Sequence, residues 1–321
     1  MRERTRGMVF GSFVGDSLAL GVHWIYRTAD IDEGVGRANY LRAPDKDSFH
    51  AGKKAGEFTH YGDQALTLLE SVAKNQGFDL ERWADDWRAL FANYRGYMDR
   101  ATKATLENFA QGKSPEEAGS HVEELAGASR MAPVIYRHRT RPDLCERFCV
   151  QQTAMTHNTA LVKEVAGFLC RVTMLVLGGE KPTAALLALQ REGGHSDELL
   201  HWLERGLETR GRNTRYVIKG FGQSCEVRYA FPSLVHLMCS YENDLAEGLV
   251  QNNMAGGDSA ARGMALGMVL GAHLGMPAVP EEWVYGLAAK NHIESLLGYL
   301  DEGLPPPLEG RSTLGPGKAP P

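Results

Sequence analysis

Several features that would assign this chain to a particular class of protein are missing. Its five cysteines are an odd number and show no Cys-x-x-Cys pair or Cys/His metal spacing, which argues against a disulfide framework and a structural zinc site. Its 35 basic residues do not outnumber its 40 acidic residues, and both kinds are mixed along the sequence. We therefore expect no polycationic surface and no nucleic-acid partner.

Long hydrophobic runs are also missing. The apolar stretch 264–278 is too short to span a bilayer and contains His273. The N-terminal segment starts with basic residues and an apolar run, but Asp16 interrupts that run and no small-residue cleavage site follows. These patterns favour a soluble, cytoplasmic protein with no membrane partner.

Strand patterns are almost absent, and helical patterns take their place. Apolar residues recur every three to four positions through most of the chain, which predicts an all-α, single compact multi-helix domain over residues 1–302. We expect a disordered tail over residues 303–321, because their Pro and Gly content cannot build a packed core. The predicted helices cover residues 63–73, 80–98, 114–126, 159–177, 182–190, 196–207, 232–241, 244–252, 259–274 and 280–300.

Two ladders of glycines stand beside an aspartate each. A spacing of four residues puts the glycines of a ladder on one helical face. A glycine inside a helix costs about 1 kcal/mol relative to alanine, so we expect close backbone contact between the two helices as compensation. Such contact would bring the two aspartates toward a common region. The first ladder is Gly7, Gly11 and Gly15, followed by Asp16, and the second is Gly263, Gly267, Gly271 and Gly275, preceded by Gly256, Gly257 and Asp258.

Five segments in order along the chain resemble the motifs of the ADP-ribosylglycohydrolases, a family that includes the dinitrogenase-reductase-activating type and crystallin relatives. The resemblance extends to about residue 300. It implies an all-helical fold with a central cleft that holds two magnesium ions and cleaves the bond at C1 of ADP-ribose. The segments are GSFVGDSLAL (11–20), GEFTHYGDQALTLLE (56–70), GASRMAPV (127–134), THNTA (156–160) and NNMAGGDSAARGMALGMVLGAHLG (252–275).

The metal ligands that the resemblance implies are largely replaced in this chain. The family takes them from Thr-Asp-Asp before one helix and from Asp-x-Asp-Thr at the start of another. Thr59, His60 and Tyr61 align with the first set, and Asp258 with Ser259 begins the second. With one carboxylate left, two divalent ions would carry a large uncompensated charge in a partly desolvated cleft. We therefore predict at most one magnesium ion, with Thr59, Asp258, Ser259 and Asp16 as its ligands.

Candidate catalytic residues lie in the same segments. Asp63 follows Thr59 by one helical turn, and Asp258 could act with it, while His60 and His23 titrate near neutral pH and suit acid or base roles. Asp16 and Asp63 have a second interpretation as helix-end residues with capping roles. For His157 we favour a structural role. The resemblance further implies substrate contacts from Gly127, Ser129, Gly222, Cys225, Gly256 and Gly257.

Two functions follow from these residues. The first is a divergent hydrolase that cleaves a glycosidic bond of ADP-ribose or a related nucleotide sugar, in a free or protein-linked substrate, with a reduced metal site or with carboxylates and histidines alone. The alternative is a catalytically inactive relative that serves as a ligand-binding or crystallin-like structural protein. Loss of carboxylates favours the alternative, and retention of Asp16, Thr59 and Asp258 favours the hydrolase.

Overall fold

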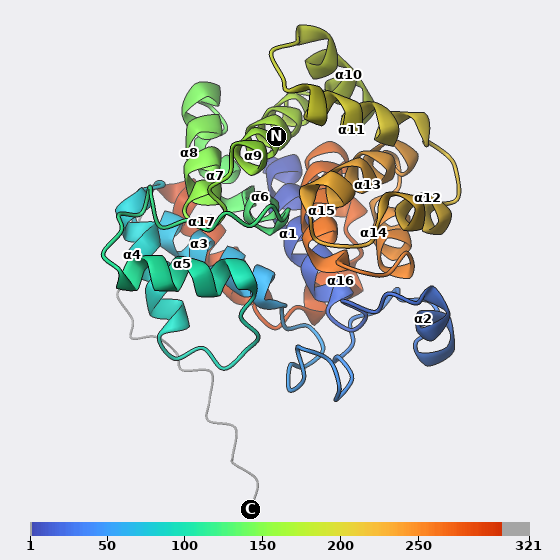
Figure 1. Cartoon of the computed structure of the whole chain (residues 1–321), viewed down its shortest axis with the longest axis horizontal. Helices are drawn as coiled ribbons and strands as arrows, with labels where there is room; N and C mark the ends of the chain where they lie inside the picture. Colours follow the sequence, from blue (N-terminus) through green and yellow to red (C-terminus); the bar gives the residue numbers. More distant parts are fainter. Residues whose placement is uncertain (1, 304–321) are drawn as a thin grey trace, which may run out of the picture.

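The computed structural model describes residues 2–303, and these residues form helices joined by turns (Figure 1). Apart from the helices, the described part of the chain has two isolated bridges, which join Ser120 to His157 and Glu124 to Glu226. The predicted all-α class is confirmed. The expected disordered tail lies, from residue 304 onward, outside the described residues. None of the described helices is long and apolar enough to cross a membrane.

The helices follow one another with short connections, except for the long segment between α2 and α3 (35–59) and the segment between α5 and α6 (111–125). The first half of the chain contains α1 (Arg2–Ala19), α2 (Thr28–Gly34), α3 (His60–Lys74), α4 (Leu80–Phe91), α5 (Arg100–Ala110), α6 (Ala126–Ser129), α7 (Ala132–His138) and α8 (Pro142–Ala154). The second half contains α9 (Ala160–Leu177), α10 (Pro182–Glu192), α11 (Asp197–Glu208), α12 (Thr214–Phe221), α13 (Val227–Ser240), α14 (Leu245–Met254), α15 (Ser259–Leu274), the 3₁₀ turn η1 (Met276–Ala278), α16 (Glu281–Gly286) and α17 (Lys290–Glu302).

The two glycine ladders pack against each other at the centre of the molecule. Helices α1 and α15 lie side by side there, and they are antiparallel because Gly7, Gly11 and Gly15 meet Gly271, Gly267 and Gly263 in reverse order (Figure 1). A Cβ atom added to Gly11 would lie 2.3 Å from the carbonyl oxygen of Gly267. The predicted helix contact is therefore confirmed. It places the C-terminal end of α1 beside the N-terminal end of α15.

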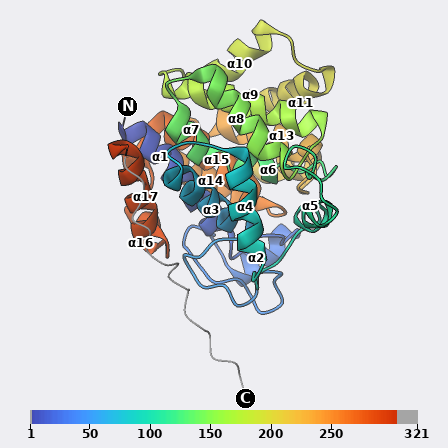
Figure 2. The same ribbon diagram turned by 90° about the vertical axis from the view of Figure 1, so that its left-hand side faces the viewer.

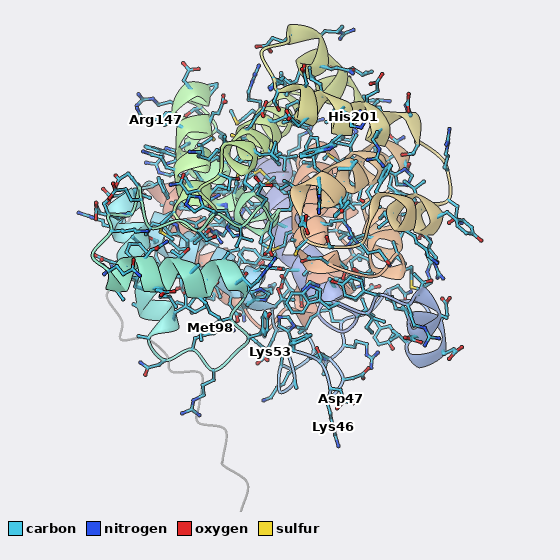
Figure 3. All side chains as sticks on the ribbon, viewed as in Figure 1. Lys46, Asp47, Lys53, Met98, Arg147 and His201 are labelled. Atoms are coloured by element: carbon cyan, nitrogen blue, oxygen red, sulfur yellow. The ribbon has the colours of Figure 1, made fainter. Side chains whose placement is uncertain are left out.

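Other helices enclose this central pair. Helices α9, α13 and α14 pack on α15, while α3, α7 and α16 pack on α1. Figure 2 shows α16 and α17 along one edge and α10 and α11 at one end of the molecule. The segment between α2 and α3 covers the end of the central pair where Asp16 and Asp258 lie. Figure 3 shows Lys46 and Asp47 extending outward from the tip of this segment, with Lys53 closer to the helical body.

The prediction of a helix over residues 114–126 is wrong. One turn begins at Ser114, whose carbonyl accepts a hydrogen bond from the amide of Ala118 at 2.8 Å. The chain then becomes extended, and Ser120 pairs with the segment before α9 through a 3.0 Å bond to the Thr156 carbonyl. A Cβ atom at Gly119 would lie 1.9 Å from the carbonyl oxygen of Ala154. Tertiary contacts have thus overridden a local helix-start signal.

Two other predicted helices are shorter or divided. The helix expected over 80–98 ends at Phe91, and the helix expected over 280–300 is interrupted between α16 and α17. Helix α3 begins at His60, not at Asp63, because the Thr59 hydroxyl accepts a hydrogen bond from the Tyr61 amide at 3.1 Å and caps it. This earlier start decides the orientation of every side chain in the first turn of α3.

Candidate active site

Asp258 is the point where three distant segments meet. This residue caps α15 through a 3.3 Å hydrogen bond from the Ala261 amide to Oδ1, and its side chain is fully buried. Its Oδ2 atom accepts the hydroxyl of Tyr61 at 3.0 Å and lies 3.4 Å from the indole nitrogen of Trp24. The joint after α1, the start of α3 and the start of α15 therefore converge, as the sequence led us to expect.

Gly256 and Gly257 allow this convergence. Both have positive φ, 71° and 72°, a conformation that glycine adopts without strain. The Gly257 amide donates to the Ile25 carbonyl at 2.8 Å, and a Cβ atom on Gly257 would lie 2.2 Å from the carbonyl oxygen of Gln223. Their close backbone approach holds the joints around Asp258 together. Whether these two glycines also contact a substrate, as the resemblance implies, stays a prediction.

Asp16 and Thr59 are hydrogen bonded to each other. The carboxylate of Asp16 accepts the Thr59 amide at 2.8 Å, the Thr59 hydroxyl at 2.6 Å and the Gly62 amide at 3.2 Å. Burial raises the pKa of Asp16 to about 6, although the hydrogen bonds from Thr59 act in the opposite direction. Asp16 thus caps α3 from a neighbouring helix, which matches its capping interpretation, and its oxygens are already engaged by protein donors.

The carboxylate of Asp63 forms its hydrogen bonds with residues other than Asp258 and its neighbours. Its Oδ2 atom accepts Lys53 Nζ at 2.6 Å and the Tyr94 hydroxyl at 2.5 Å. Burial raises the pKa of Asp63, and the charge of Lys53 partly offsets that rise. The carboxylate therefore ties the segment before α3 and the segment after α4 to α3.

His23 presents a buried donor without a partner. Its Nδ1 atom accepts the amide of Ala260 at 3.3 Å, so the proton of the neutral ring is on Nε2. That Nε2 atom is buried and has no hydrogen-bond partner among residues 2–303. Burial holds the pKa of His23 well below its usual value, and the ring is neutral near pH 7. Such an orphaned donor marks a place for a ligand or water.

A chain of hydrogen bonds ends at a second orphaned nitrogen. Oδ2 of Asp99 lies 3.2 Å from Nε2 of His60, and Nδ1 of His60 lies 3.0 Å from Nε2 of His50. Nδ1 of His50 is buried and has no partner within the described chain. Burial lowers the pKa of His50 to about 3. Burial raises the pKa of Asp99, but the hydrogen bond and charge of His60 outweigh this, so its pKa lies below the ordinary value.

The two orphaned nitrogens are complementary. In the tautomer in which a neutral His60 donates from Nε2 to Asp99, its Nδ1 accepts from His50 Nε2, and His50 keeps a free lone pair on Nδ1. His23 offers a donor and His50 an acceptor, and their ring centroids are 5.4 Å apart. A hydroxyl group or a water molecule both accepts and donates. A group of this kind that reached both atoms would satisfy them, whereas a carbonyl or an ammonium group would satisfy only one.

Aromatic rings connect this cluster to the surface. Trp24 packs against Phe49 and Tyr97 with centroid distances of 5.3 and 5.0 Å, and Phe49 lies 5.2 Å from Tyr97. We call these three residues the aromatic rim. Phe49 is 66% exposed, so the aromatic rim reaches the surface of the protein. Flat apolar rings at the entrance of a polar interior suit a ligand with a planar base or a sugar face.

Arg262 balances the charge of Asp258 from one turn further along α15. Its fully buried guanidinium donates to the Gly256 carbonyl at 2.7 Å and to Oδ1 of Asn252 at 3.1 Å. Burial lowers the pKa of Arg262 to about 10, so it remains a cation, and its charge lowers the pKa of Asp258 against the larger rise due to burial. The buried hydroxyl of Ser259 has no partner among the described residues.

The residues around Asp258 do not fit a pair of magnesium ions. Mg²⁺ needs several open oxygen ligands in near-octahedral geometry. Here the oxygens of Asp16 and Thr59 are hydrogen bonded to each other, and the hydroxyl of Tyr61 occupies Oδ2 of Asp258. Arg262 already supplies a cation beside the one remaining carboxylate. The expectation of at most one ion stays a prediction, and no step proposed below uses magnesium.

The other predicted substrate-contact residues form their contacts within the protein, and Cys225 lies close enough to Asp258 for the charge of that carboxylate to raise its pKa. Gly127 and Ser129 are buried; Gly127 accepts Gln152 Nε2 at its carbonyl, and the Ser129 hydroxyl donates to the Ala126 carbonyl at 2.8 Å. Gly222 ends α12 with φ 117° and packs on Tyr229. Burial raises the pKa of Cys225 far above its ordinary value, so this residue is a neutral thiol and a poor nucleophile.

His50 and Asp99 belong to the site, although the sequence did not indicate them. Asp99 could have been noticed as a helix N-cap, since its Oδ1 accepts the Thr102 amide at 2.6 Å. His50 lies in a segment without periodicity, and nothing in its spacing links it to His60. The contact between them appears only when the segment between α2 and α3 folds back over α3.

Comparison with known proteins agrees with this fold and with the five motifs. The sequence profile of the ADP-ribosylglycohydrolase family matches residues 1–307, and the chain belongs to this family. Among its relatives, a protein without assigned function from Archaeoglobus fulgidus is 26% identical over 306 residues, which cover 94% of this chain and 97% of that protein. Crystallin J1A of Tripedalia cystophora is 21% identical, with 91% of this chain and 94% of the crystallin covered.

A solved structure supports the fold assignment independently. It is described as an ADP-ribosylglycohydrolase-related protein complex and superposes with a TM-score of 0.74. The match covers 94% of this chain and 98% of that chain at 21% sequence identity. At this identity the similarity establishes the shared helical fold, while the chemistry depends on the residues that this chain places around Asp258.

Proposed function

We propose that this protein is a magnesium-independent hydrolase that cleaves a glycosidic bond of ADP-ribose or of a related nucleotide sugar. The observation that carries this proposal is the pair of complementary orphaned nitrogens on His23 and His50. His23 accepts the amide of Ala260, two residues after Asp258, and the rings of His23 and His50 lie 4.4 and 5.5 Å from the ring of Trp24. Membership in the family supports the substrate class. The replacement of the expected metal ligands supports a mechanism that uses protein side chains alone.

Each residue has a role that follows from its contacts. A water molecule or a sugar hydroxyl between the two rings would accept from His23 Nε2 and donate to His50 Nδ1. Asp99 and His60 position His50 and fix its tautomer. Asp258 supplies the negative charge that stabilises an oxocarbenium-like centre at C1 as the leaving group departs. Water then adds to C1 and loses a proton, which passes by way of His50 to the departing nitrogen or oxygen, so the products are ADP-ribose and the protonated acceptor. Tyr61 must turn its hydroxyl from Asp258 toward the substrate for this charge to be available.

We expect the protein to hydrolyse ADP-ribosyl-arginine or ADP-ribosyl-serine substrates at the same rate with Mg²⁺ and with excess chelator. Asp258→Asn should lower kcat by roughly 100-fold or more, because it removes the charge and keeps the shape of the side chain. The measurement is release of ADP-ribose under single-turnover and steady-state conditions. His201→Gln on the exposed face of α11 is a control that should retain the parent rate (Figure 3).

Other outcomes of this experiment would contradict the proposal. Full activation by Mg²⁺ and loss of activity with chelator would show that catalysis depends on the metal. Equal rates for the parent and Asp258→Asn would remove Asp258 from catalysis.

The alternative, a ligand-binding or crystallin-like protein without activity, also has an observation in its favour. Asp258 already accepts Tyr61 and Trp24, so its carboxylate is satisfied without a substrate. Calorimetric titration with ADP-ribose separates the two functions. Binding without turnover of any ADP-ribosylated substrate would favour the alternative, and the absence of both binding and turnover would exclude a nucleotide-sugar site.

A further inference from the structure

Three cysteines from two helices meet in the interior, away from Asp258. Cys145 and Cys149 lie one turn apart on α8, and Cys170 lies on α9. All three are fully buried, and their sulfur atoms lie within 4.8 Å of one another. Figure 3 shows Arg147, between the first two in sequence, pointing outward from α8, consistent with an inward direction for its cysteine neighbours. The sequence suggested ordinary core residues and gave no sign of this convergence.

The spacing of the sulfur atoms suits a metal ion better than a disulfide. An ion at about 2.3 Å from each of three sulfurs would separate them by about 4.0 Å. The observed distance between Sγ of Cys145 and Sγ of Cys170 is 3.8 Å. A disulfide would require an approach to about 2.05 Å between two packed helices and would leave the third thiol unpaired. Small side-chain rotations are enough for the metal.

The donor set selects the kind of ion. No fourth His, Cys, Asp or Glu joins the cluster among residues 2–303, whereas structural zinc sites take four ligands. Soft sulfur donors without a fourth ligand favour Cu(I).

We propose that Cys145, Cys149 and Cys170 form a three-sulfur site for a soft monovalent metal ion, Cu(I), that links α8 to α9. Binding replaces one thiol proton with the ion, so the site stays neutral with one thiolate and two thiol ligands, and it changes no oxidation state. The site is separate from the residues of the proposed hydrolase site, so this proposal does not depend on the proposed function. Its direct effect is on stability, because the ion joins two helices of the core and binds the folded chain in preference to the unfolded one.

The test is an anaerobic titration of the full, reduced, metal-free chain with Cu(I) buffered by bicinchoninate. We expect one ion per chain, a rise in Tm, and X-ray absorption that shows sulfur neighbours at about 2.3 Å. Cys170→Ala should weaken binding by roughly 100-fold or more, since it removes a direct ligand. Cys239→Ala changes another buried cysteine outside the cluster and should leave binding unchanged.

Several results would overturn the site. These are no binding in competition with the chelator, nitrogen neighbours in place of sulfur, or parent affinity in Cys170→Ala. Thermal unfolding of each metal-free variant shows whether it folds, and Cys145→Ala replaces Cys170→Ala if the latter does not. Thiol counting in denaturant after purification in air adds a separate check. Five free thiols support the proposal, and three would indicate a disulfide and contradict it.

Discussion

Replacing Gly267 with alanine is expected to lower the free energy of unfolding by about 3 kcal/mol or more, because it forces the two central helices apart. A Cβ atom at this position would lie 2.0 Å from the carbonyl oxygen of Gly11 and 2.5 Å from its carbonyl carbon. Both obstacles are backbone atoms of a buried helix, so no side chain can rotate away. The gain of about 1 kcal/mol in helix propensity is too small to compensate.

Gly298 provides the matched control. It also lies inside a helix, α17, but a Cβ atom there would have no atom within 4 Å. Gly298→Ala should therefore raise the free energy of unfolding by about 0.5–1 kcal/mol, through propensity and a less flexible unfolded chain. Thermal and urea unfolding of both variants measure the contrast, with a fall in Tm of roughly 5–10 °C for Gly267→Ala. A similar change in the two variants would show that the glycine ladders do not set the helix spacing.

The glycine ladders show what the sequence could reveal. Their four-residue period is a local pattern, and it was enough to predict that α1 and α15 touch and that Asp16 and Asp258 lie at one end of the pair. The helix over residues 259–274 and the family motifs were likewise visible. Each of these features is encoded within one helix or one joint, so reading along the chain recovers it.

Features that depend on long-range folding were not visible. One partner of His60 is His50, from a segment without periodicity. The segment after Ser114 has a sound helix-start signal, yet pairing with Thr156 and close packing of Gly119 make it extended. In each case a contact between distant residues, whose energy exceeds local preferences, decided the outcome.

Acid is expected to destabilise the protein strongly below about pH 6, because several histidines are buried in the neutral form. Burial lowers the pKa of His50 to about 3 and those of His157 and His236 to about 4, and it holds the pKa of His23 well below 6.5. The unfolded chain takes up protons near pH 6.5, whereas the folded chain does not. The contribution of these neutral histidines to the free energy of unfolding is therefore complete above pH 6.5 and is lost progressively as the pH falls toward 4.

The expected loss of stability in acid is large because the pKa of each of these histidines is far from its ordinary value. A shift of two or more pKa units in each of several groups amounts to a loss on the order of several kcal/mol between pH 7 and pH 4, comparable to the stability of many domains. Asp16 acts in the opposite direction, since its raised pKa of about 6 lets the folded state gain a proton between pH 6 and 4. Asp63 and Asp258, whose pKa values burial also raises, act in the same direction as Asp16, and the three carboxylates offset part of the loss from four histidines.

Urea unfolding at several pH values between 4.5 and 7.5 tests this expectation. His236 is the best single probe, because it lies apart from Asp258 and its ring nitrogens contact the hydroxyls of Thr209 and Thr214 at 3.1 and 3.0 Å. His236→Gln should lower stability at pH 7 but flatten its dependence on pH, whereas His201→Gln at the surface should leave the slope unchanged. If stability stayed constant from pH 7.5 to 4.5, the histidines would have to be charged or solvated in the folded protein, and the hydrogen-bonding roles assigned to His23 and His50 would lose their basis.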